Sequence, residues 1–183
     1  MLILSPLVID TAIEGLAVLA LGANIYAYRQ NEVQRYRIYS GIAMLLLSLH
    51  FFALQAYAAG IGCGLAMIRN AVSLRFNGWL CTSIFIAINI VCFCYEWFIL
   101  KHGPEILIAY TVSLIFTVGT LRINNASQLK KLFFSAELLS IIYCVIVGSI
   151  FGGIYGLFNA MVILHWWVIK SKTEKELIRQ RTV

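Results

Sequence analysis

The sequence predicts an all-α integral membrane protein with seven transmembrane helices, built from two copies of a three-helix bundle. Three observations carry this prediction: an apolar composition, seven apolar stretches of membrane-spanning length, and a repeat with a period of 92 residues. Hydrophobic residues make up 61% of the 183 residues and charged residues 12%, and the mean hydropathy is +0.87. Because soluble domains contain about 25% charged residues, this composition excludes a sizeable soluble domain.

The apolar stretches are separated by polar breaks and are about 17–25 residues long, which is the length that crosses a bilayer as a helix. Some breaks are basic, and the others are short and either contain glycine or are nearly neutral. We expect helices near residues 7–28, 38–58, 60–76, 79–100, 105–121, 130–151 and 153–170.

The first helix, at 7–28, begins after Pro6 and ends at the basic segment 29–37. Residues 1–10 lack the basic start that is typical of a cleaved secretory signal. We therefore expect this helix to stay in the membrane.

Glycines divide two long apolar runs into the second and third helices and the sixth and seventh helices. Gly60 and Gly62 interrupt the run from 38 to 76, and Gly152-Gly153 interrupts the run from 130 to 170. Since glycine favours reversals of the chain, we expect the two turns at these glycines.

Charged and proline-containing segments delimit the middle helices. The helix at 79–100 ends at the nearly neutral segment 101–105, where Pro104 precedes the helix at 105–121. The basic segment 122–131 then separates the fifth helix from the sixth.

The basic residues predict the topology, because cytoplasmic loops of membrane proteins carry the excess of Lys and Arg. With the N-terminus outside and the C-terminus in the cytoplasm, Lys101 lies outside, Arg69 lies within a helix, and the other basic residues lie inside. Their division among four short loops argues against binding of nucleic acid. The cytoplasmic set is Arg29, Arg35, Arg37, Arg75, Arg122, Lys130, Lys131, Lys170, Lys172, Lys175, Arg179 and Arg181.

A repeat relates the two halves of the chain. Such internal similarity is typical of transporters built from duplicated bundles, in which the substrate site lies near the bilayer midplane between the copies. Because each copy has an odd number of helices, a joining helix gives both copies the same orientation. Leu46-Leu47-Ser48, Gly60, Gly64 and Leu65 recur 92 residues later as Leu138-Leu139-Ser140, Gly152, Gly156 and Leu157.

This parallel 3+1+3 plan predicts four parts of the chain. They are a first triple-helix bundle at 1–77, a linker helix at 78–103, a second bundle at 104–171 and a cytoplasmic tail at 172–183.

The plan resembles that of SWEET and PQ-loop transporters, and a stretch of the sequence resembles the YgjV family of bacterial inner-membrane proteins. The second resemblance agrees with the length and helix number of the whole chain and is specific over residues 46–76. Together they imply a multi-pass protein of the bacterial cell inner membrane whose bundles have the helix order one-three-two. The matching residues are Leu49-His50-Phe51-Phe52, Tyr57-Ala58-Ala59-Gly60, Ala66-Met67-Ile68-Arg69-Asn70 and Leu74-Arg75.

Polar side chains inside the expected helices are candidates for a solute site, because a charge near the bilayer centre costs about 2.5–3.5 kcal/mol on insertion scales. Arg69 lies about nine residues into its expected helix, roughly 13 Å deep at 1.5 Å per residue. It either ties helices together or binds an anionic or polyhydroxylated solute. We expect Glu14, at a similar depth in a neighbouring helix, to pair with Arg69 beside a cavity shared with Asn159.

Glu137 and His50 have alternative roles. Either acid, Glu14 or Glu137, can pair with Arg69 or carry a proton in a dry site; Glu137 can also extend to the cytoplasmic interface, as Glu14 can to the outer one. His50 is either a proton relay near physiological pH or a residue bonded to a backbone carbonyl.

Amides and hydroxyls inside the helices complete the candidate set. Asn24, Asn70 and Asn159 can bind a solute or join two helices, and joining helices is the commoner use of Asn in membranes. Further candidates for lining a pore are Gln55, Thr111, Ser113 and Thr117.

Other motifs favour packing over chemistry. The GxxxG spacings Gly60/Gly64 and Gly152/Gly156 allow close helix packing and leave self-association open. His165 and the adjacent Trp166-Trp167 are typical of an aromatic belt at the membrane interface. We predict no cofactor and no metal site, since the cysteines Cys63, Cys81, Cys92, Cys94 and Cys144 form no ligand pattern.

We therefore expect a transporter or facilitator of a small polar solute, with the lipid bilayer as its surroundings. The chain has no HExxH or Gly-x-Ser-x-Gly motif, which disfavours a membrane enzyme. A retinal-type photoreceptor needs a Lys at the middle of its last helix, whereas Lys170 is at the end. A non-transporting structural or assembly role, or a receptor, stays open.

Overall fold

The computed structural model describes the backbone of residues 6–54, 57–76, 78–101 and 103–181, and the side chains of 13–54, 59–76, 78–101 and 103–169. Residues 1–5, the pore candidate Gln55 and the side chains of the basic tail from Lys170 onwards lie outside these described residues. Within them the chain is helical and has no strand.

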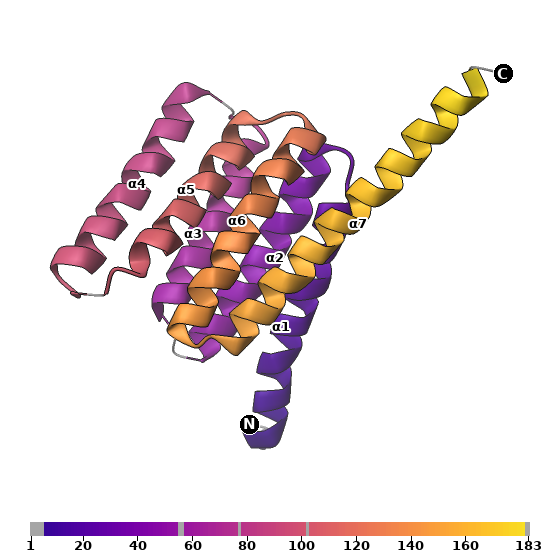
Figure 1. Ribbon diagram of the computed structural model, residues 1–183. Helices are drawn as coiled ribbons and strands as arrows, with labels where there is room; N and C mark the ends of the chain where they lie inside the picture. Colours follow the sequence, from indigo (N-terminus) through magenta and orange to yellow (C-terminus); the bar gives the residue numbers. More distant parts are fainter. Residues whose placement is uncertain (1–5, 55–56, 77, 102, 182–183) are drawn as a thin grey trace.

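Seven helices are described, one for each apolar stretch (Figure 1). By length and apolar composition, Val33–Ala53, Trp79–Phe98 and Ile150–Ile169 can each cross a membrane, and Ile106–Arg122 is apolar but shorter. The helices are α1 (Pro6–Arg29), α2 (Val33–Ala53), α3 (Tyr57–Ser73), α4 (Trp79–Phe98), α5 (Ile106–Arg122), α6 (Ala126–Val147) and α7 (Ile150–Arg181).

Three helices extend beyond their predicted ends into polar sequence, and for a common reason. The helix α2 begins at Val33, α6 begins at Ala126, and α7 continues to Arg181, so the expected tail at 172–183 is helical as far as it is described. Lys, Arg, Glu and Gln are good helix formers. Hydropathy therefore shows where a helix becomes polar, but it does not show where the helical backbone ends.

Both predicted glycine turns are wrong. The helix α2 ends at Ala53 and α3 begins at Tyr57, so Gly60 and Gly62 lie inside α3. The helix α6 ends at Val147 and is capped by Gly148, which has the left-handed φ of 71° that glycine tolerates. The pair Gly152-Gly153 therefore lies inside α7.

The glycines inside α3 and α7 allow these helices to approach the preceding helix. A Cβ on Gly60 would lie 2.9 Å from the Phe52 ring, and the Gly60 carbonyl accepts a 2.7 Å hydrogen bond from Ser48. A Cβ on Gly152 would lie 2.7 Å from Cys144 Sγ in the same way. These glycines therefore lie where consecutive helices approach closely, as their GxxxG spacing predicts.

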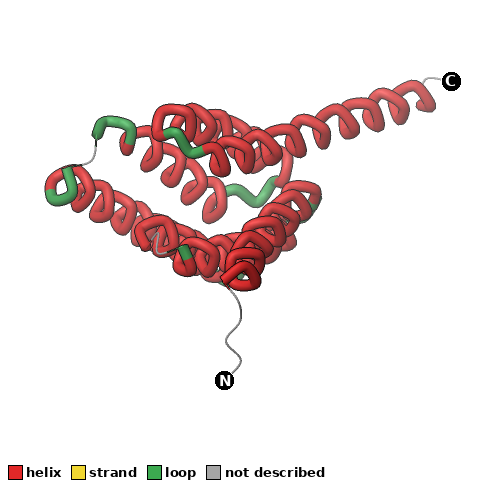
Figure 2. The backbone as a smooth tube through the Cα atoms, turned by 90° about the horizontal axis from the view of Figure 1, so that it is seen from below, coloured by secondary structure: helices red, strands yellow, loops and turns green. Residues whose placement is uncertain are grey.

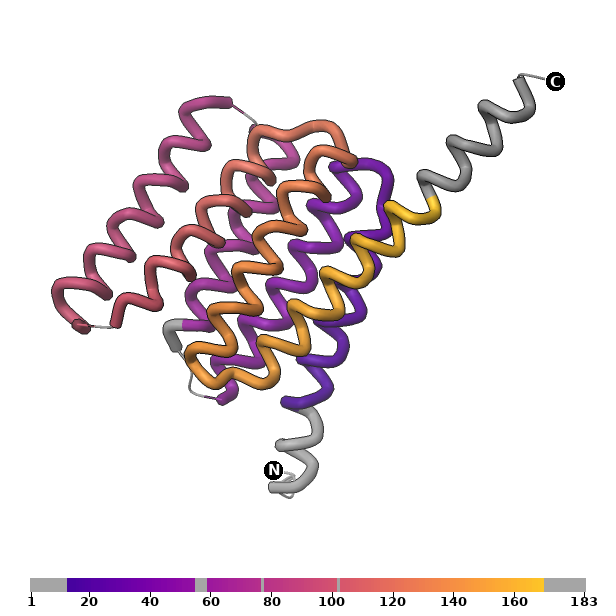
Figure 3. Tube along the Cα trace, in the orientation of Figure 1, coloured from indigo at the N-terminus to yellow at the C-terminus, as the bar shows by residue number. Residues whose placement is uncertain are grey.

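The helices lie in two layers, seen from below in Figure 2. In one layer α1 packs on α2 and α2 packs on α3, and in the other α5, α6 and α7 pack in sequence, with α4 outside α5. The layers meet where α1 contacts α7 and where α3 contacts α5; Figure 3 shows α7 crossing α1. The helix order one-three-two that the SWEET resemblance implied is wrong, because α2 lies between α1 and α3.

An aromatic core fills the end of the bundle at the α1–α2 and α5–α6 connections. The ring centroid of Phe133 lies 4.8 Å from that of Phe116 and 5.5 Å from that of Tyr36. A Cβ on Gly119 would lie 2.4 Å from Phe133 Cε1, so this glycine permits the contact between α5 and α6. The buried cluster is Ala27, Tyr28, Val33, Tyr36, Leu129, Phe133 and Ile163.

Two basic residues expected in cytoplasmic loops are buried at this same end. Arg37 is 2% exposed, and Lys130 is also buried, with Nζ 3.8 Å from the centre of the Trp166 ring. The outer surface is apolar, since side chains such as Val18, Leu80 and Val145 face outwards. An apolar exterior around polar interior groups is what a lipid environment requires.

Candidate functional site

Arg69 is a buried cation at the contact between the two layers. Its side chain is 8% exposed, and Nη1 donates a 3.0 Å hydrogen bond to Thr117 Oγ1 of α5. Its Nε has no hydrogen-bond partner in the described part of the chain. Because α3 ends at Ser73, Arg69 is about 6 Å from that end at 1.5 Å per residue, closer to it than the sequence suggested.

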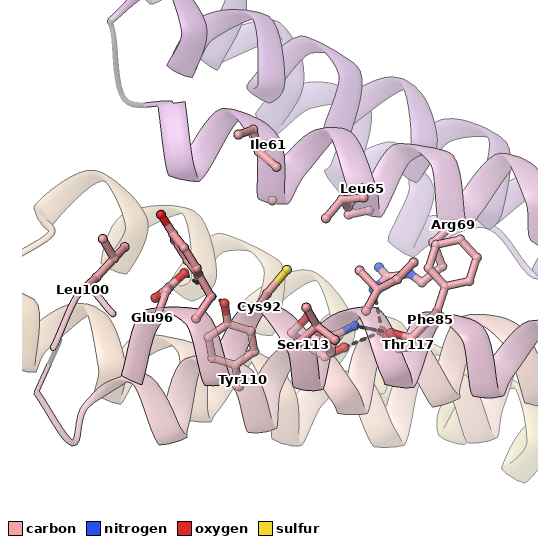
Figure 4. Close-up of a pocket in the computed structure, with 16 residues that line it drawn as sticks. Ile61, Leu65, Arg69, Phe85, Cys92, Glu96, Leu100, Tyr110, Ser113 and Thr117 are labelled. Carbon is pink, nitrogen blue, oxygen red and sulfur yellow. Dashed lines mark hydrogen bonds between the residues drawn. The ribbon is translucent and has the colours of Figure 1, made fainter. Parts of the chain in front are cut away.

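Arg69 borders a cavity of about 390 Å³ between α3, α4 and α5 (Figure 4). Apolar side chains such as Leu65, Phe85 and Ile88 form much of its wall. Its polar lining includes Arg69, Asn89, Tyr95, Glu96, Tyr110, Ser113 and Thr117.

The polar groups near Arg69 form one hydrogen-bonded array. Thr117 accepts from Arg69 and donates a 2.8 Å bond to the Ser113 carbonyl. The Ser113 hydroxyl donates to Asn89 Oδ1, and Asn89 Nδ2 donates 2.8 Å to the Phe85 carbonyl. Asn89, Ser113 and Thr117 are thus oriented beside the guanidinium by helices α4 and α5.

An acidic group lies at the other end of the cavity. Tyr110 donates a 2.9 Å hydrogen bond from its hydroxyl to Glu96 Oε1. Glu96 is seven residues from Asn89 on α4, and Tyr110 is seven from Thr117 on α5, so both helices place the two polar groups about 10 Å apart. The cavity therefore has a cationic end and an acidic end joined by an apolar wall.

A second buried polar cluster lies between α1, α6 and α7. Glu137 is 4% exposed, and its Oε1 accepts from the Tyr28 hydroxyl at 2.6 Å and from Asn159 Nδ2 at 3.0 Å. Asn24 Nδ2 in turn donates 3.1 Å to Asn159 Oδ1. The alternative in which Glu137 extends to the cytoplasmic interface is wrong, because Glu137 is buried and lies about 16 Å along α6 from its start at Ala126.

The predicted pair of Arg69 with Glu14 is wrong. Glu14 is exposed on α1, and the only salt bridge among the described residues joins Arg35 to Glu32. The pairing assumed that α1 and α3 are neighbours, whereas α2 separates them. Asn159 also does not line the Arg69 cavity, since it is bonded within the Glu137 cluster.

Asn70 and His50 join helices. Asn70 is 1% exposed and donates a 3.2 Å hydrogen bond to Ser40 Oγ of α2. His50 Nδ1 lies 2.8 Å from the carbonyl oxygen of Ile13, which ties α2 to α1. For both residues, and for Asn24, the structural alternative matches the observed contacts.

The sequence patterns used above do not indicate several of the residues that line the cavity. Glu96 and Asn89 were not singled out, although their spacing of seven residues places them on one face of α4. Tyr110, Ser113 and Thr117 follow the i, i+3, i+7 spacing on α5. Thr111, which we also predicted for the pore, is exposed and bonds its own helix.

The aromatic residues in the middle of α7 have mixed environments. His165 is exposed, whereas Trp166 donates a 3.0 Å hydrogen bond from Nε1 to Asn31 Oδ1 and covers Lys130. Trp167 packs on Phe134, with ring centroids 5.3 Å apart. These tryptophans therefore contribute to the packing of α7 on α6.

Comparison with known proteins gives one match. The Imp-YgjV family model, described as bacterial inner membrane protein, matches residues 11–172. No curated protein and no solved structure matches the chain. The matched range includes every residue that lines the Arg69 cavity and every residue of the Glu137 cluster.

Proposed function

The chain belongs to the Imp-YgjV family of bacterial inner membrane proteins, and from this premise we propose that it transports a small polar solute across the membrane. In this proposal the cavity beside Arg69 is the solute site, and the protein moves its ligand without changing it chemically. The proposal rests on one observation above all: the buried guanidinium of Arg69, whose Nε has no hydrogen-bond partner among the described residues, borders the cavity between α3, α4 and α5.

The energetic cost of this arrangement supports a ligand. A buried donor without an acceptor costs about 1–3 kcal/mol, and more for charged groups. A membrane protein retains such a cation where it faces protein, water or substrate. A carboxylate or hydroxyl entering the cavity would supply the missing acceptor.

The geometry of the guanidinium favours an anionic or polyhydroxylated solute. Arg presents a planar fork of donors that matches a carboxylate. Asn89 and Ser113 lie next to it and offer amide and hydroxyl groups for further hydroxyls of the solute. Gluconate, which combines a carboxylate with several hydroxyls, is the probe that these contacts suggest first.

A parallel duplication of the bundles is part of the proposal. In a duplicated structure α1 is equivalent to α5, and α3 is equivalent to α7. The contact of α1 with α7 then has the contact of α5 with α3 as its counterpart, and both contacts are present. The equivalent glycines Gly64 and Gly156 also both face the preceding helix, near Ser48 and Ile141 respectively. These features support a 3+1+3 transporter plan. The excess of Lys and Arg in alternate loops favours the N-terminus outside and the C-terminus in the cytoplasm.

The test is uptake of radiolabelled gluconate, sorbitol and succinate by liposomes containing the purified protein. Arg69→Lys keeps the charge but loses the fork, so uptake should fall about ten- to hundredfold, as for loss of a charged hydrogen bond worth about 1.5–3 kcal/mol. Arg35→Lys is the matched control, because Arg35 is exposed and remote from the cavity.

Expression and thermal stability of the Arg69→Lys protein distinguish the two roles of the residue. A solute-binding role predicts lost uptake with yield and unfolding temperature close to those of the wild type. Equal loss of uptake and stability would favour the structural role, and no uptake of any solute by the wild type would contradict the proposal.

A further inference from the structure

Glu137 is a buried acid surrounded by neutral donors. The titratable groups that interact with it electrostatically are Tyr28 of α1, Tyr36 of α2, Tyr155 of α7 and Cys144 of its own helix. The cation of this region, Arg69, interacts with the two tyrosines Tyr28 and Tyr36. No Lys or Arg forms a salt bridge with Glu137 in the part of the chain that the structure describes.

The hydrogen bonds leave one carboxyl oxygen available for a proton. The Tyr28 hydroxyl and the Asn159 amide both donate to Oε1. Oε1 can accept these bonds as a carboxylate oxygen or as the carbonyl oxygen of a carboxylic acid. The proton therefore belongs on Oε2, which faces α7 where Gly156 has no side chain; a Cβ there would lie 3.6 Å away.

Both protonation states are thus accommodated by the same partners. The ionised state is buried and has no salt-bridge partner within the described residues, which is costly. This energetic cost is offset by the two hydrogen-bond donors, because they bind a charged oxygen about twice as strongly as a neutral one. A carboxyl balanced in this way can gain and lose a proton without rearrangement of its donors.

The same bonds connect the two halves of the protein. Tyr28 and Asn24 belong to α1, whereas Glu137 and Asn159 belong to α6 and α7. Loss of the proton strengthens the bonds that hold α1 against α6 and α7, and binding of the proton weakens them. Protonation therefore acts on a contact between the two bundles, which is the contact that alternating access must change.

We propose that Glu137 is the proton-binding group of a proton-coupled transporter, in which one proton on its Oε2 accompanies each solute molecule. This inference rests on the proposed transport function and adds the identity of the driving ion. The proton comes from water on one side of the membrane and is released on the other, so no further reactant is needed.

The first experiment measures the protonation without using transport. Infrared difference spectra of the purified protein between acidic and alkaline pH should contain the C=O band of a buried carboxylic acid. The band should be absent in Glu137→Gln and retained in Glu14→Gln, the matched control on an exposed acid. Tyr28→Phe removes one donor from the ionised form, so the band should persist to higher pH; it serves as the second variant if Glu137→Gln does not fold.

The second experiment measures the coupling in liposomes with radiolabelled gluconate. With an acidic exterior, the wild type should accumulate solute by about tenfold for each pH unit of gradient, which is the limit for one proton per solute. Glu137→Gln should still exchange internal for external solute but should stop at equal concentrations. Glu14→Gln should behave as the wild type.

The outcomes separate the two proposals. Wild-type uptake that is independent of the pH gradient would contradict proton coupling through Glu137, and so would an infrared band that is still present in Glu137→Gln. Neither result would contradict the transport function itself. Absence of wild-type uptake and exchange for every solute tested would overturn the transport function and the coupling with it.

Discussion

Arg37 provides a quantitative test of how the two layers are held together. Its Nε donates 3.0 Å to the Thr120 carbonyl at the end of α5, its Nη1 donates 3.1 Å to the Ser73 carbonyl at the end of α3, and its Nη2 donates 3.2 Å to Asn124 Oδ1. The carbonyls at a helix C-terminus attract cations. A single guanidinium from α2 therefore joins the ends of two helices that meet at the layer contact.

Arg37→Met should destabilise the protein through these carbonyls. Losing the donor to a buried carbonyl costs about 1–3 kcal/mol, and two carbonyls lose theirs, so we expect a loss of about 2–6 kcal/mol. At roughly 2–4 °C per kcal/mol for a chain of this size, the unfolding temperature in detergent should fall by at least about 4 °C. Thermal unfolding followed by circular dichroism at one heating rate measures this change.

Arg35→Met is the matched control for this variant. Arg35 lies on the same helix, and its pair with Glu32 is exposed on both sides, so its loss should cost less than about 1 kcal/mol. Similar unfolding temperatures for Arg37→Met and Arg35→Met would refute the role assigned to Arg37.

Two further predictions concern packing and topology. Gly119→Ala places a Cβ against the Phe133 ring and should lower the free energy of unfolding by about 1–3 kcal/mol through overpacking. The control Gly15→Ala meets no neighbouring atom and should leave the stability unchanged. Equal denaturation midpoints for the two variants would contradict the packing argument. Reporter fusions should be active in the cytoplasm after Val183 and in the periplasm near Gly103, and a periplasmic C-terminus would eliminate the proposed topology.

The helices were predictable from the sequence because each apolar stretch has to be helical in a membrane. The turns were less predictable. Glycine serves both turns and close helix packing, and hydropathy does not distinguish Gly148, which forms a left-handed cap, from Gly152, which packs against Cys144. The difference depends on the neighbouring helix.

The candidate site was predictable in part. Arg69 was singled out because a charge inside an apolar helix is costly, and it does border the cavity. Its partner was predicted wrongly, because pairing depends on the lateral order of helices, which periodicity does not specify. Arg37 was missed because the charge pattern places it in a loop, whereas α2 begins at Val33 and turns it inwards.

The most direct test of the central claim, that a solute occupies the Arg69 cavity, uses Cys92 in the cavity wall. In a variant with the other four cysteines replaced by serine, a thiol reagent should modify Cys92, and saturating solute identified by uptake should slow this modification at least severalfold. The protection should be lost in Arg69→Lys. Modification of Cys92 at the same rate with and without a transported solute would contradict the account.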